Sequence, residues 1–257
     1  MEIPRKPLPT RVDQTPDLPP AYEAALRHGL ADLRLDLTAE ARAAIDGHAR
    51  LLLAWTEAIN LTAIREPGAV ATAHVIDSLT ALPLLRERSI DRFVDIGAGG
   101  GYPGLPLAAA LPAARALLAE PIGKKAGFLE AVIAATGLEV FAEAAAVRAE
   151  TLAGDARHRG RWPAVTARAV ASLADLVEIG FPLLAPAGIL VAWKRGDLAA
   201  ELVAAQRAVD ALGGGRLDVR EVSVGGLEGH RLVIASLGGR VPSTYPRDPG
   251  ARRRRPW

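Results

Sequence analysis

The chain has 257 residues, half of them hydrophobic, and no cysteine. That length accommodates one large domain or slightly more, with a sizeable core. The lack of cysteine excludes disulfides, thiolate zinc sites and a cysteine nucleophile, and it fits a reducing, cytoplasmic location. The formal charge of +2 is unevenly spread, because residues 240–257 hold six Arg and one Asp, a surplus of five, so the rest carries minus three.

The first twenty residues are Pro-rich and polar, which predicts a flexible arm over residues 1–20. They contain no apolar stretch typical of a signal peptide, and no segment offers about 18 uninterrupted apolar residues. We therefore expect neither a leader nor a membrane partner. Residues 21–90 are predicted to form an N-terminal helical cap, since apolar residues in Glu40–Asn60 recur at three- and four-residue steps. Thr38 is a candidate N-cap for that helix, and a second helix is expected over Ala69–Leu85, with Pro67 near its start.

From Arg92 the pattern changes to short apolar runs that alternate with amphipathic stretches. The expected strands are Phe93–Ile96, Ala116–Ala119, Glu139–Phe141, Ala164–Ala167, Ile189–Trp193, Val219–Val224 and Arg231–Leu237. The expected helices are Leu105–Leu111, Lys124–Thr136, Leu173–Leu184 and Leu198–Leu212. This alternation predicts an α/β domain over residues 91–239 with a doubly wound, mostly parallel, Rossmann-like sheet, in which the last two strands form an antiparallel hairpin. Residues 240–257 are predicted to be a basic tail, which suits a polyanionic partner or forms a solvated, disordered end.

The sequence FVDIGAGGGYPGLPLA at residues 93–108 places a glycine-rich turn between a strand and a helix. Glycines there allow positive φ and a close approach of a nucleotide-like cofactor. Glu120, at the end of the next expected strand, is suitably placed for the ribose hydroxyls of either NAD or S-adenosylmethionine. Asp95 favours S-adenosylmethionine, because a carboxylate just before the first glycine would repel a pyrophosphate but can meet the amino group of a methionine moiety. A packing turn without a ligand is the remaining alternative.

Several blocks of the chain resemble the glucose-inhibited division protein B family. They are NLTAI and HVIDSL at residues 60–64 and 74–79, the glycine loop itself, EPIGKKAGFLEAV at 120–132, VRAE at 147–150, TARAVASL at 166–173 and WKRG at 193–196. The resemblance spans about residues 40–200. It implies a class I S-adenosylmethionine-dependent methyltransferase that methylates N7 of guanine 527 in bacterial 16S ribosomal RNA.

The family motifs imply a set of site residues. Together with Asp95, the expected cofactor-binding residues are Gly97, Gly99, Tyr102, Glu120, Pro121, Ile122, Ala149, Glu150 and Arg168. The chain departs from the family pattern in three places. Glu120 replaces the more common Asp, Pro121-Ile122 replaces Ser-Leu and so loses a hydroxyl, and Arg195 intervenes between Lys194 and Gly196. The last departure leaves open which of the two cations faces the site.

The implied reaction needs no general base, because guanine N7 has a lone pair and no proton. The reaction depends instead on proximity, alignment and tolerance of moving charge. Arg168, after the fourth strand, is the candidate catalytic residue, since its guanidinium could hold guanine O6, a phosphate or the methionine carboxylate; the alternative is a surface ion pair. Candidate RNA contacts are Lys124, Lys125, Arg148 and Lys194.

The remaining polar residues favour structural roles. His74, Asp77 and Ser78 share one helix face, and we expect them to pin the N-terminal helices against the cofactor loop rather than to form a triad. His28, His48, His158 and His230 show no metal spacing, so no metal is expected. Trp55 and Trp193 are expected in the core.

The sequence leaves other functions open. The same fold could methylate a small molecule or a protein, or the chain could be a non-catalytic assembly factor that binds ribosomal RNA. The substrate could be naked 16S RNA or an assembled 30S subunit. We expect a monomer.

Overall fold

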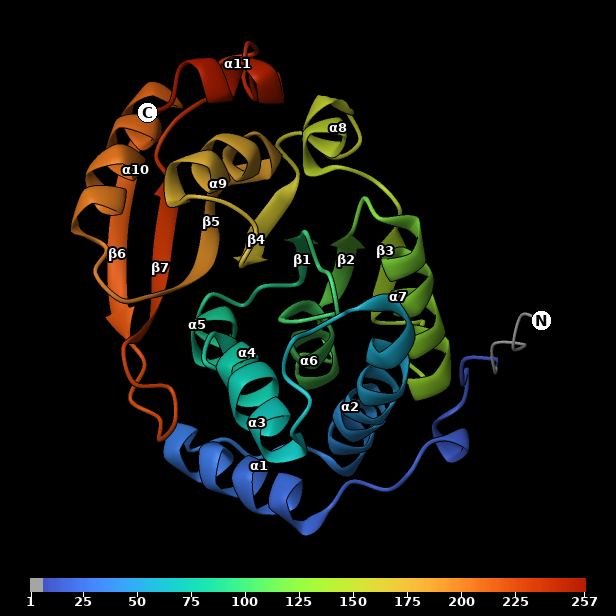
Figure 1. The fold of residues 1–257 in the computed structure, drawn as a ribbon. Helices are drawn as coiled ribbons and strands as arrows, with labels where there is room; N and C mark the ends of the chain where they lie inside the picture. The colour runs from blue at the N-terminus through green and yellow to red at the C-terminus, as the bar shows by residue number, and fades with distance from the viewer. Residues whose placement is uncertain (1–6) are drawn as a thin grey trace.

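The fold is a seven-stranded sheet with helices on both faces, and the N-terminal helices lie on one of these faces (Figure 1). It is described by a computed structural model of residues 7–257. The strand order is β3-β2-β1-β4-β5-β7-β6; β1 to β5 are parallel, and β7 is antiparallel to both of its neighbours. The predicted α/β sheet and its terminal hairpin are therefore confirmed. The strands are β1 Arg92–Ile96, β2 Arg115–Ala119, β3 Ala142–Ala145, β4 Trp162–Arg168, β5 Leu184–Arg195, β6 Gly215–Glu221 and β7 His230–Leu237.

Successive side chains of the strands point to opposite faces of the sheet, and they pack into two hydrophobic cores, one on each face. Phe93 belongs to the first core and its neighbour Val94 to the second, as the period of two in a strand requires. Phe128, which lies in α7 (Gly123–Thr136), and Trp193 join the first core, on the side of the N-terminal helices, while Phe181 joins the second. Full burial of one such aromatic or aliphatic side chain is worth about 1.5–3 kcal/mol. The central strands β1 and β4 are therefore covered by apolar side chains on both faces.

The helices alternate with the strands much as the periodicity predicts. The expected helix Leu173–Leu184 ends four residues early, because a 3-10 turn at Phe181–Leu183 leads directly into β5. The short helices α8 and α11 were not expected. The α-helices are α1 Pro20–Leu33, α2 Ala39–Ile59, α3 Pro67–Val70, α4 Asp77–Leu79, α5 Leu82–Glu87, α6 Gly104–Ala110, α7 Gly123–Thr136, α8 Ala149–Gly154, α9 Leu173–Gly180, α10 Ala199–Ala211 and α11 Pro249–Arg254.

One expected strand is wrong. Glu139–Phe141 lies in the turn after α7, where the Phe141 amide donates to the Leu138 carbonyl at 2.8 Å. The third strand is instead Ala142–Ala145, with the sequence AEAA. Alanine and glutamate have low strand propensity, so this strand owes its conformation to its pairing with β2 rather than to its own residues.

The N-terminal segment is helical, and α1 to α5, between Pro20 and Glu87, contribute side chains to the first hydrophobic core. Thr38 caps α2 by accepting a hydrogen bond from the Ala41 amide at 3.2 Å.

The run Pro67–Glu87 comprises α3, a π-helical stretch at Ala71–Ile76, α4 and α5. By length and composition alone it could cross a membrane, but 61% of its most apolar window is buried within the fold, as in the core helix of a globular protein.

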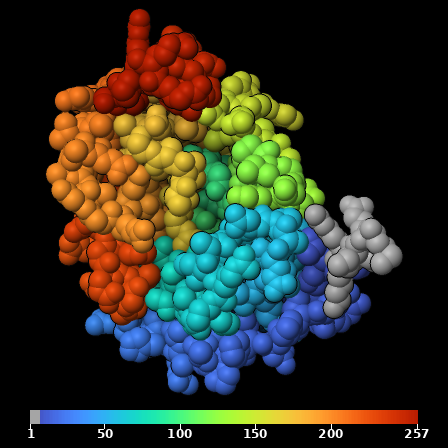
Figure 2. Space-filling model, in the orientation of Figure 1, coloured from blue at the N-terminus to red at the C-terminus, as the bar shows by residue number. Residues whose placement is uncertain are grey.

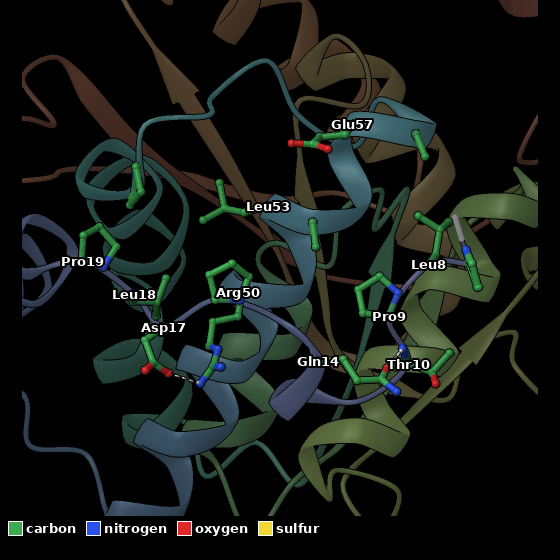
Figure 3. Close-up of a pocket in the computed structure, with 15 residues that line it drawn as sticks. Leu8, Pro9, Thr10, Gln14, Asp17, Leu18, Pro19, Arg50, Leu53 and Glu57 are labelled. Atoms are coloured by element: carbon green, nitrogen blue, oxygen red, sulfur yellow. Dashed lines mark hydrogen bonds and ion pairs between the residues drawn. The ribbon is translucent and has the colours of Figure 1, made fainter. Parts of the chain in front are cut away.

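The two ends of the chain differ from expectation. The expected arm covers residues 1–20, of which 1–6 lie outside the described residues. Residues 7–19 pack on α2, where the Trp55 indole donates to the Pro9 carbonyl at 2.7 Å and the Arg50 guanidinium to the Thr15 hydroxyl at 3.1 Å. Figure 3 shows the groove of about 1270 Å³ between this segment and α2, lined by apolar groups such as Leu18 and Leu53. The basic tail is also folded onto the domain rather than being a free, solvated end.

Candidate active site

The glycine loop follows β1 and turns sharply into α6. Gly97, Gly99 and Gly101 have φ of +69°, +54° and +88°, in the left-handed region that favours glycine. A Cβ at Gly97 would lie 2.7 Å from the Val170 side chain, and one at Gly101 would lie 2.5 Å from Leu105. The loop is therefore too tightly folded for larger residues, and it presents bare backbone to the cleft above it.

Glu120 links the end of β2 to this loop. Its side chain is 4% exposed; Oε2 accepts from the Gly99 amide at 2.9 Å and Oε1 from the Ile122 amide at 2.8 Å. Each carboxylate oxygen has a second lone pair, so the group can brace the loop and still accept hydrogen bonds from a ligand.

Asp95 lies under the loop rather than in the cleft, which corrects the expectation that it meets a ligand. It is fully buried, and its carboxylate accepts from the Gly104 amide at 3.1 Å and the Thr166 hydroxyl at 2.8 Å. Burial raises the pKa of Asp95 to about 7, against the opposite effect of those two hydrogen bonds. The acid before the glycines thus ties β1 to β4 and to the start of α6, and this placement does not support a ligand contact.

An open cleft of about 780 Å³ lies where the ends of β1, β2, β4 and β5 meet the N-terminal helices. This is the edge at which parallel sheets of this type bind ligands. The cleft brings together most of the sequence-predicted site residues: Gly97, Gly99, Tyr102, Glu120, Pro121, Ile122, Lys125, Arg168 and Lys194.

Arg168 joins the end of β4 to the helical cap. Its guanidinium donates to the Ala73 carbonyl at 2.8 Å and the Asp77 carboxylate at 2.9 Å, and it contacts His74 Nδ1 at 3.2 Å. Asp77 is 3% exposed and also accepts from His230 Nδ1 at 3.0 Å. Asp77 thus holds the cap to the end of β4 and the start of β7 rather than to the glycine loop, and the buried Ser78 hydroxyl donates to the His74 carbonyl, one turn earlier.

Tyr102 forms one wall of the cleft, between two histidines. Its ring stacks on His48 at 4.3 Å and on His74 at 4.9 Å, with the Arg168 guanidinium 5.5 Å from its centroid. Burial raises the pKa of Tyr102, and burial lowers the pKa of His48 to about 3 and of His74 to about 4. All three rings are therefore neutral near pH 7. The Tyr102 hydroxyl is buried and has no hydrogen-bond partner among residues 7–257.

The expected RNA-contact residues are not equivalent. Lys124 and Arg148 are exposed, at the first turn of α7 and at the N-cap of α8. Lys125 lines the cleft. Lys194 also lines it, but its ammonium group donates to Glu201 at 2.6 Å and to the Ala171 carbonyl at 2.9 Å. The neighbouring Arg195 is exposed at the rim of the cleft.

Besides Asp95, two expected cofactor residues do not line this cleft. Ala149 and Glu150 begin α8, and the Glu150 carboxylate is engaged by Arg252 at 2.5 Å. Conversely, sequence reasoning did not place Glu201 and His230 here, although both line the cleft, from α10 and β7. Each is a single polar residue without a recognisable motif around it, and only the order of the strands brings it to this edge.

Metal ligation finds no support in the part of the chain that the structure describes. No three side chains of His, Asp or Glu among residues 7–257 are grouped to hold a metal ion.

Comparisons with known proteins agree with this arrangement. A family model described as GidB, rRNA small subunit methyltransferase G, matches residues 42–228. Proteins named ribosomal RNA small subunit methyltransferase G are similar over most of the chain. The relative from Roseiflexus sp. strain RS-1 is 40% identical over 205 residues, 80% of this chain and 87% of that protein. The relative from Desulforamulus reducens is 34% identical over 232 residues, 90% of this chain and 96% of that protein.

Solved structures share the fold at low sequence identity. An O-methyltransferase from Bacillus cereus, determined in complex with SAH, has a TM-score of 0.53 and 17% identity over 75% of this chain and 91% of that one. A SAM-dependent O-methyltransferase from Thermotoga maritima has a TM-score of 0.53 and 15% identity over 74% of this chain and 72% of that one. These likenesses support a class I methyltransferase fold.

Proposed function

Since the chain belongs to the rRNA small subunit methyltransferase G family, we propose that it methylates N7 of a guanine in 16S ribosomal RNA, with S-adenosylmethionine as the methyl donor. Guanine 527 is the target that the family motifs imply. The single observation that carries the proposal is the cleft in which Glu120, the glycine loop and Arg168 converge.

The residues of the cleft fit such a cofactor. The bare backbone at Gly97 gives clearance for the amino-acid portion of the donor, and the remaining lone pairs of Glu120 are placed to accept from ribose hydroxyls. Pro121 and Ile122 offer apolar surface beside that carboxylate. The buried Tyr102 hydroxyl, which has no partner among the described residues, is available to a ligand at the wall of the cleft. Ala149 and Glu150 do not line the cleft, and a contact between them and the cofactor stays a prediction.

The chain has little proton chemistry to perform. When bound, S-adenosylmethionine would supply an electrophilic methyl group and leave as S-adenosylhomocysteine. Guanine N7 has its own lone pair, so no residue of the chain has to remove a proton from the nucleophile. Arg168 has three of its five N–H donors engaged by Ala73, Asp77 and His74. The two others are free to hold guanine O6 or a phosphate oxygen in line with the methyl group. The neutral rings of Tyr102, His48 and His74 keep the wall beside it uncharged.

The partner and location follow from the same function. We propose that the substrate is 16S RNA or the 30S subunit that contains it, and that the protein acts as a monomer in the cytoplasm, where bacterial ribosomes assemble. Lys125 and Arg195 lie at the cleft with cationic side chains suited to phosphates, whereas Lys194 is held by Glu201.

Labelled S-adenosylmethionine separates this function from its alternatives. The purified protein is incubated with 30S subunits from a strain that lacks the enzyme, and the RNA and protein fractions are counted. We expect label in 16S RNA only. Label in ribosomal protein would indicate a protein methyltransferase, and binding of the cofactor without any transfer would indicate a non-catalytic assembly factor.

A further inference from the structure

The basic tail, residues 240–257, lies beyond the family match, which ends at residue 228. The fold divides its six arginines into two groups. Arg247 and Arg252 point inward and pair with carboxylates. The other four are exposed and form no ion pair with any carboxylate of residues 7–257: Arg240, Arg253, Arg254 and Arg255.

The first anchor of the tail is Glu178 of α9, whose side chain is fully buried. Its carboxylate accepts from the Arg247 guanidinium at 2.5–3.1 Å, from the Arg247 amide at 2.8 Å and from the Trp257 indole at 2.7 Å. The Arg247 guanidinium also lies 4.6 Å from the Trp257 ring centroid. One buried carboxylate therefore fixes both the approach to α11 and the last residue of the chain.

The second anchor sets the position of α11. Arg252 donates to Glu150 at 2.5 Å and lies 3.8 Å from Asp175. Glu150 is in the first turn of α8, after β3, and Asp175 is in the first turn of α9, after β4. Helices that follow parallel strands begin at the carboxyl edge of the sheet, so α11 is held at the edge that contains the cleft. Figure 1 shows α11 beside α8 and next to α9, and Figure 2 shows it on the surface.

Further cations lie at this edge, in the segments that follow neighbouring strands. Lys124 and Lys125 are in the first turn of α7, after β2. Arg148 is the N-cap residue of α8, after β3, and stands two positions before Glu150, which anchors the tail. Arg253–Arg255 follow the anchor residue Arg252 directly. The nearby acids Glu150, Asp175 and Glu178 are neutralised by the anchoring arginines. The exposed charge of the docked helix is therefore positive.

We propose that α11 and Arg255 form a phosphate-binding surface for ribosomal RNA beside the methyl-transfer cleft, with Arg253, Arg254 and Arg255 as its contacts. The inference rests on the proposed function for the identity of the nucleic acid. When three exposed guanidinium groups contact RNA phosphates, they release counterions from the RNA. This release raises the affinity for RNA but does not depend on the base sequence. Arg247 and Arg252 are positioning residues, because their guanidinium groups are engaged by Glu178, Glu150 and Asp175 and hold the helix in place.

The test is the triple variant Arg253→Gln/Arg254→Gln/Arg255→Gln, which keeps both anchors. Binding to 30S subunits and to protein-free 16S RNA is measured by filter binding at several salt concentrations. We expect the Kd for both probes to rise about tenfold or more near physiological salt, and the slope of log Kd against log salt to fall by about 2, since about 0.7 counterion is released per phosphate contact. The kcat for methyl transfer at saturating RNA should not change.

The matched control removes three exposed arginines from the opposite edge, as Arg88→Gln/Arg92→Gln/Arg216→Gln. Arg92 begins β1, Arg88 precedes it, and Arg216 is near the start of β6, which runs parallel to β5. Equal loss of binding in the two triple variants would overturn the proposal, because net charge alone would explain it. Unchanged RNA binding in the tail variant would also overturn it, and weaker binding to 30S subunits alone would indicate a ribosomal protein as the partner. None of these outcomes depends on methyl transfer, so a failure of the proposed activity is seen separately in the wild-type protein.

Discussion

Arg168 and Asp77, 91 positions apart in the chain, form a nearly buried ion pair at 2.9 Å between the end of β4 and the first residue of α4. The pair closes the contact between the methyltransferase sheet and the helical cap, directly at the cleft. A guanidinium held on three sides is preorganised, so it loses little conformational freedom when it meets a substrate. The ion pair thus links the stability of the cap to the geometry of the site.

Arg168→Lys tests this geometry. Lysine keeps the charge but cannot contact Asp77, Ala73 and a substrate oxygen at the same time. We expect the variant to fold, to bind S-adenosylmethionine, and to lose at least about 2 kcal/mol of transition-state stabilisation, roughly 30-fold in kcat. Single-turnover kinetics on 30S subunits measure the loss. The control Lys194→Arg preserves the cation beside Glu201 and should change kcat little; wild-type turnover in Arg168→Lys would remove Arg168 from the chemistry.

Glu120→Gln tests the expected ribose contact. The amide keeps one acceptor oxygen, so it cannot accept from both the Gly99 and Ile122 amides and still offer two sites to a ligand. We expect the Kd for S-adenosylmethionine, measured by calorimetry, to rise about tenfold, which corresponds to about 1.4 kcal/mol. An unchanged Kd would reject the assignment of Glu120 to the cofactor.

Gly97→Ala tests the loop conformation. The substitution adds a Cβ at φ +69° that would lie 2.7 Å from Val170. We expect a loss of about 1–3 kcal/mol in the free energy of unfolding, together with weaker cofactor binding. Gly127→Ala is the matched control, because a Cβ there meets nothing within 4 Å and the residue lies inside α7. That control should be neutral or stabilise by up to about 1 kcal/mol; a similar destabilisation in both variants would contradict the account of the loop.

The buried histidines predict loss of stability in acid. His48 and His74 have folded-state pKa values of about 3 and about 4, below the usual 6.5, so below pH 6.5 the unfolded chain takes up protons that the folded one does not. Their contribution is present above pH 6.5 and is lost as pH falls toward 4 and 3. Asp95 acts in the opposite direction, because its folded pKa of about 7 lies above 3.8, so its contribution is lost as pH rises from about 4 to 7.

The effect of the two histidines on stability is larger than the opposite effect of the one aspartate. The free energy of unfolding should therefore fall as the pH is lowered from 6.5 to 4. The expected slope is up to about 1.4 kcal/mol per pH unit, which is the contribution of the one histidine that the aspartate does not offset. Urea unfolding at several pH values measures this slope. His48→Phe should flatten it and Asp95→Asn should steepen it. Slopes that stay the same as in the wild type in both variants would show that these groups titrate near their ordinary values in the folded state.

The sheet was predictable because its central strands and helices have clear hydrophobic periodicity. The turn after β1 was predictable because FVDIGAGGG places several glycines directly after an apolar strand, and three of them have positive φ in the structure. The strand AEAA was not, since its conformation depends on β2. The role of Asp95 was also misread, because the sequence shows that an acid precedes the glycines but not that its carboxylate points away from the cleft. The docking of the tail depends on Glu178, Glu150 and Asp175, which no local pattern connects with an arginine run.

The most direct test of the central claim is to map the methyl group on the RNA. 30S subunits from a strain that lacks the enzyme are treated with the protein and S-adenosylmethionine, and the 16S RNA is then reduced with borohydride, cleaved with aniline and sequenced, which breaks the chain at N7-methylguanine. The account predicts one new break, at guanine 527, that is absent without the cofactor and reduced at early times with Arg168→Lys. If S-adenosylmethionine with a labelled methyl group is used, label in the RNA without a break at guanine 527, or no label in the RNA at all, would contradict the account.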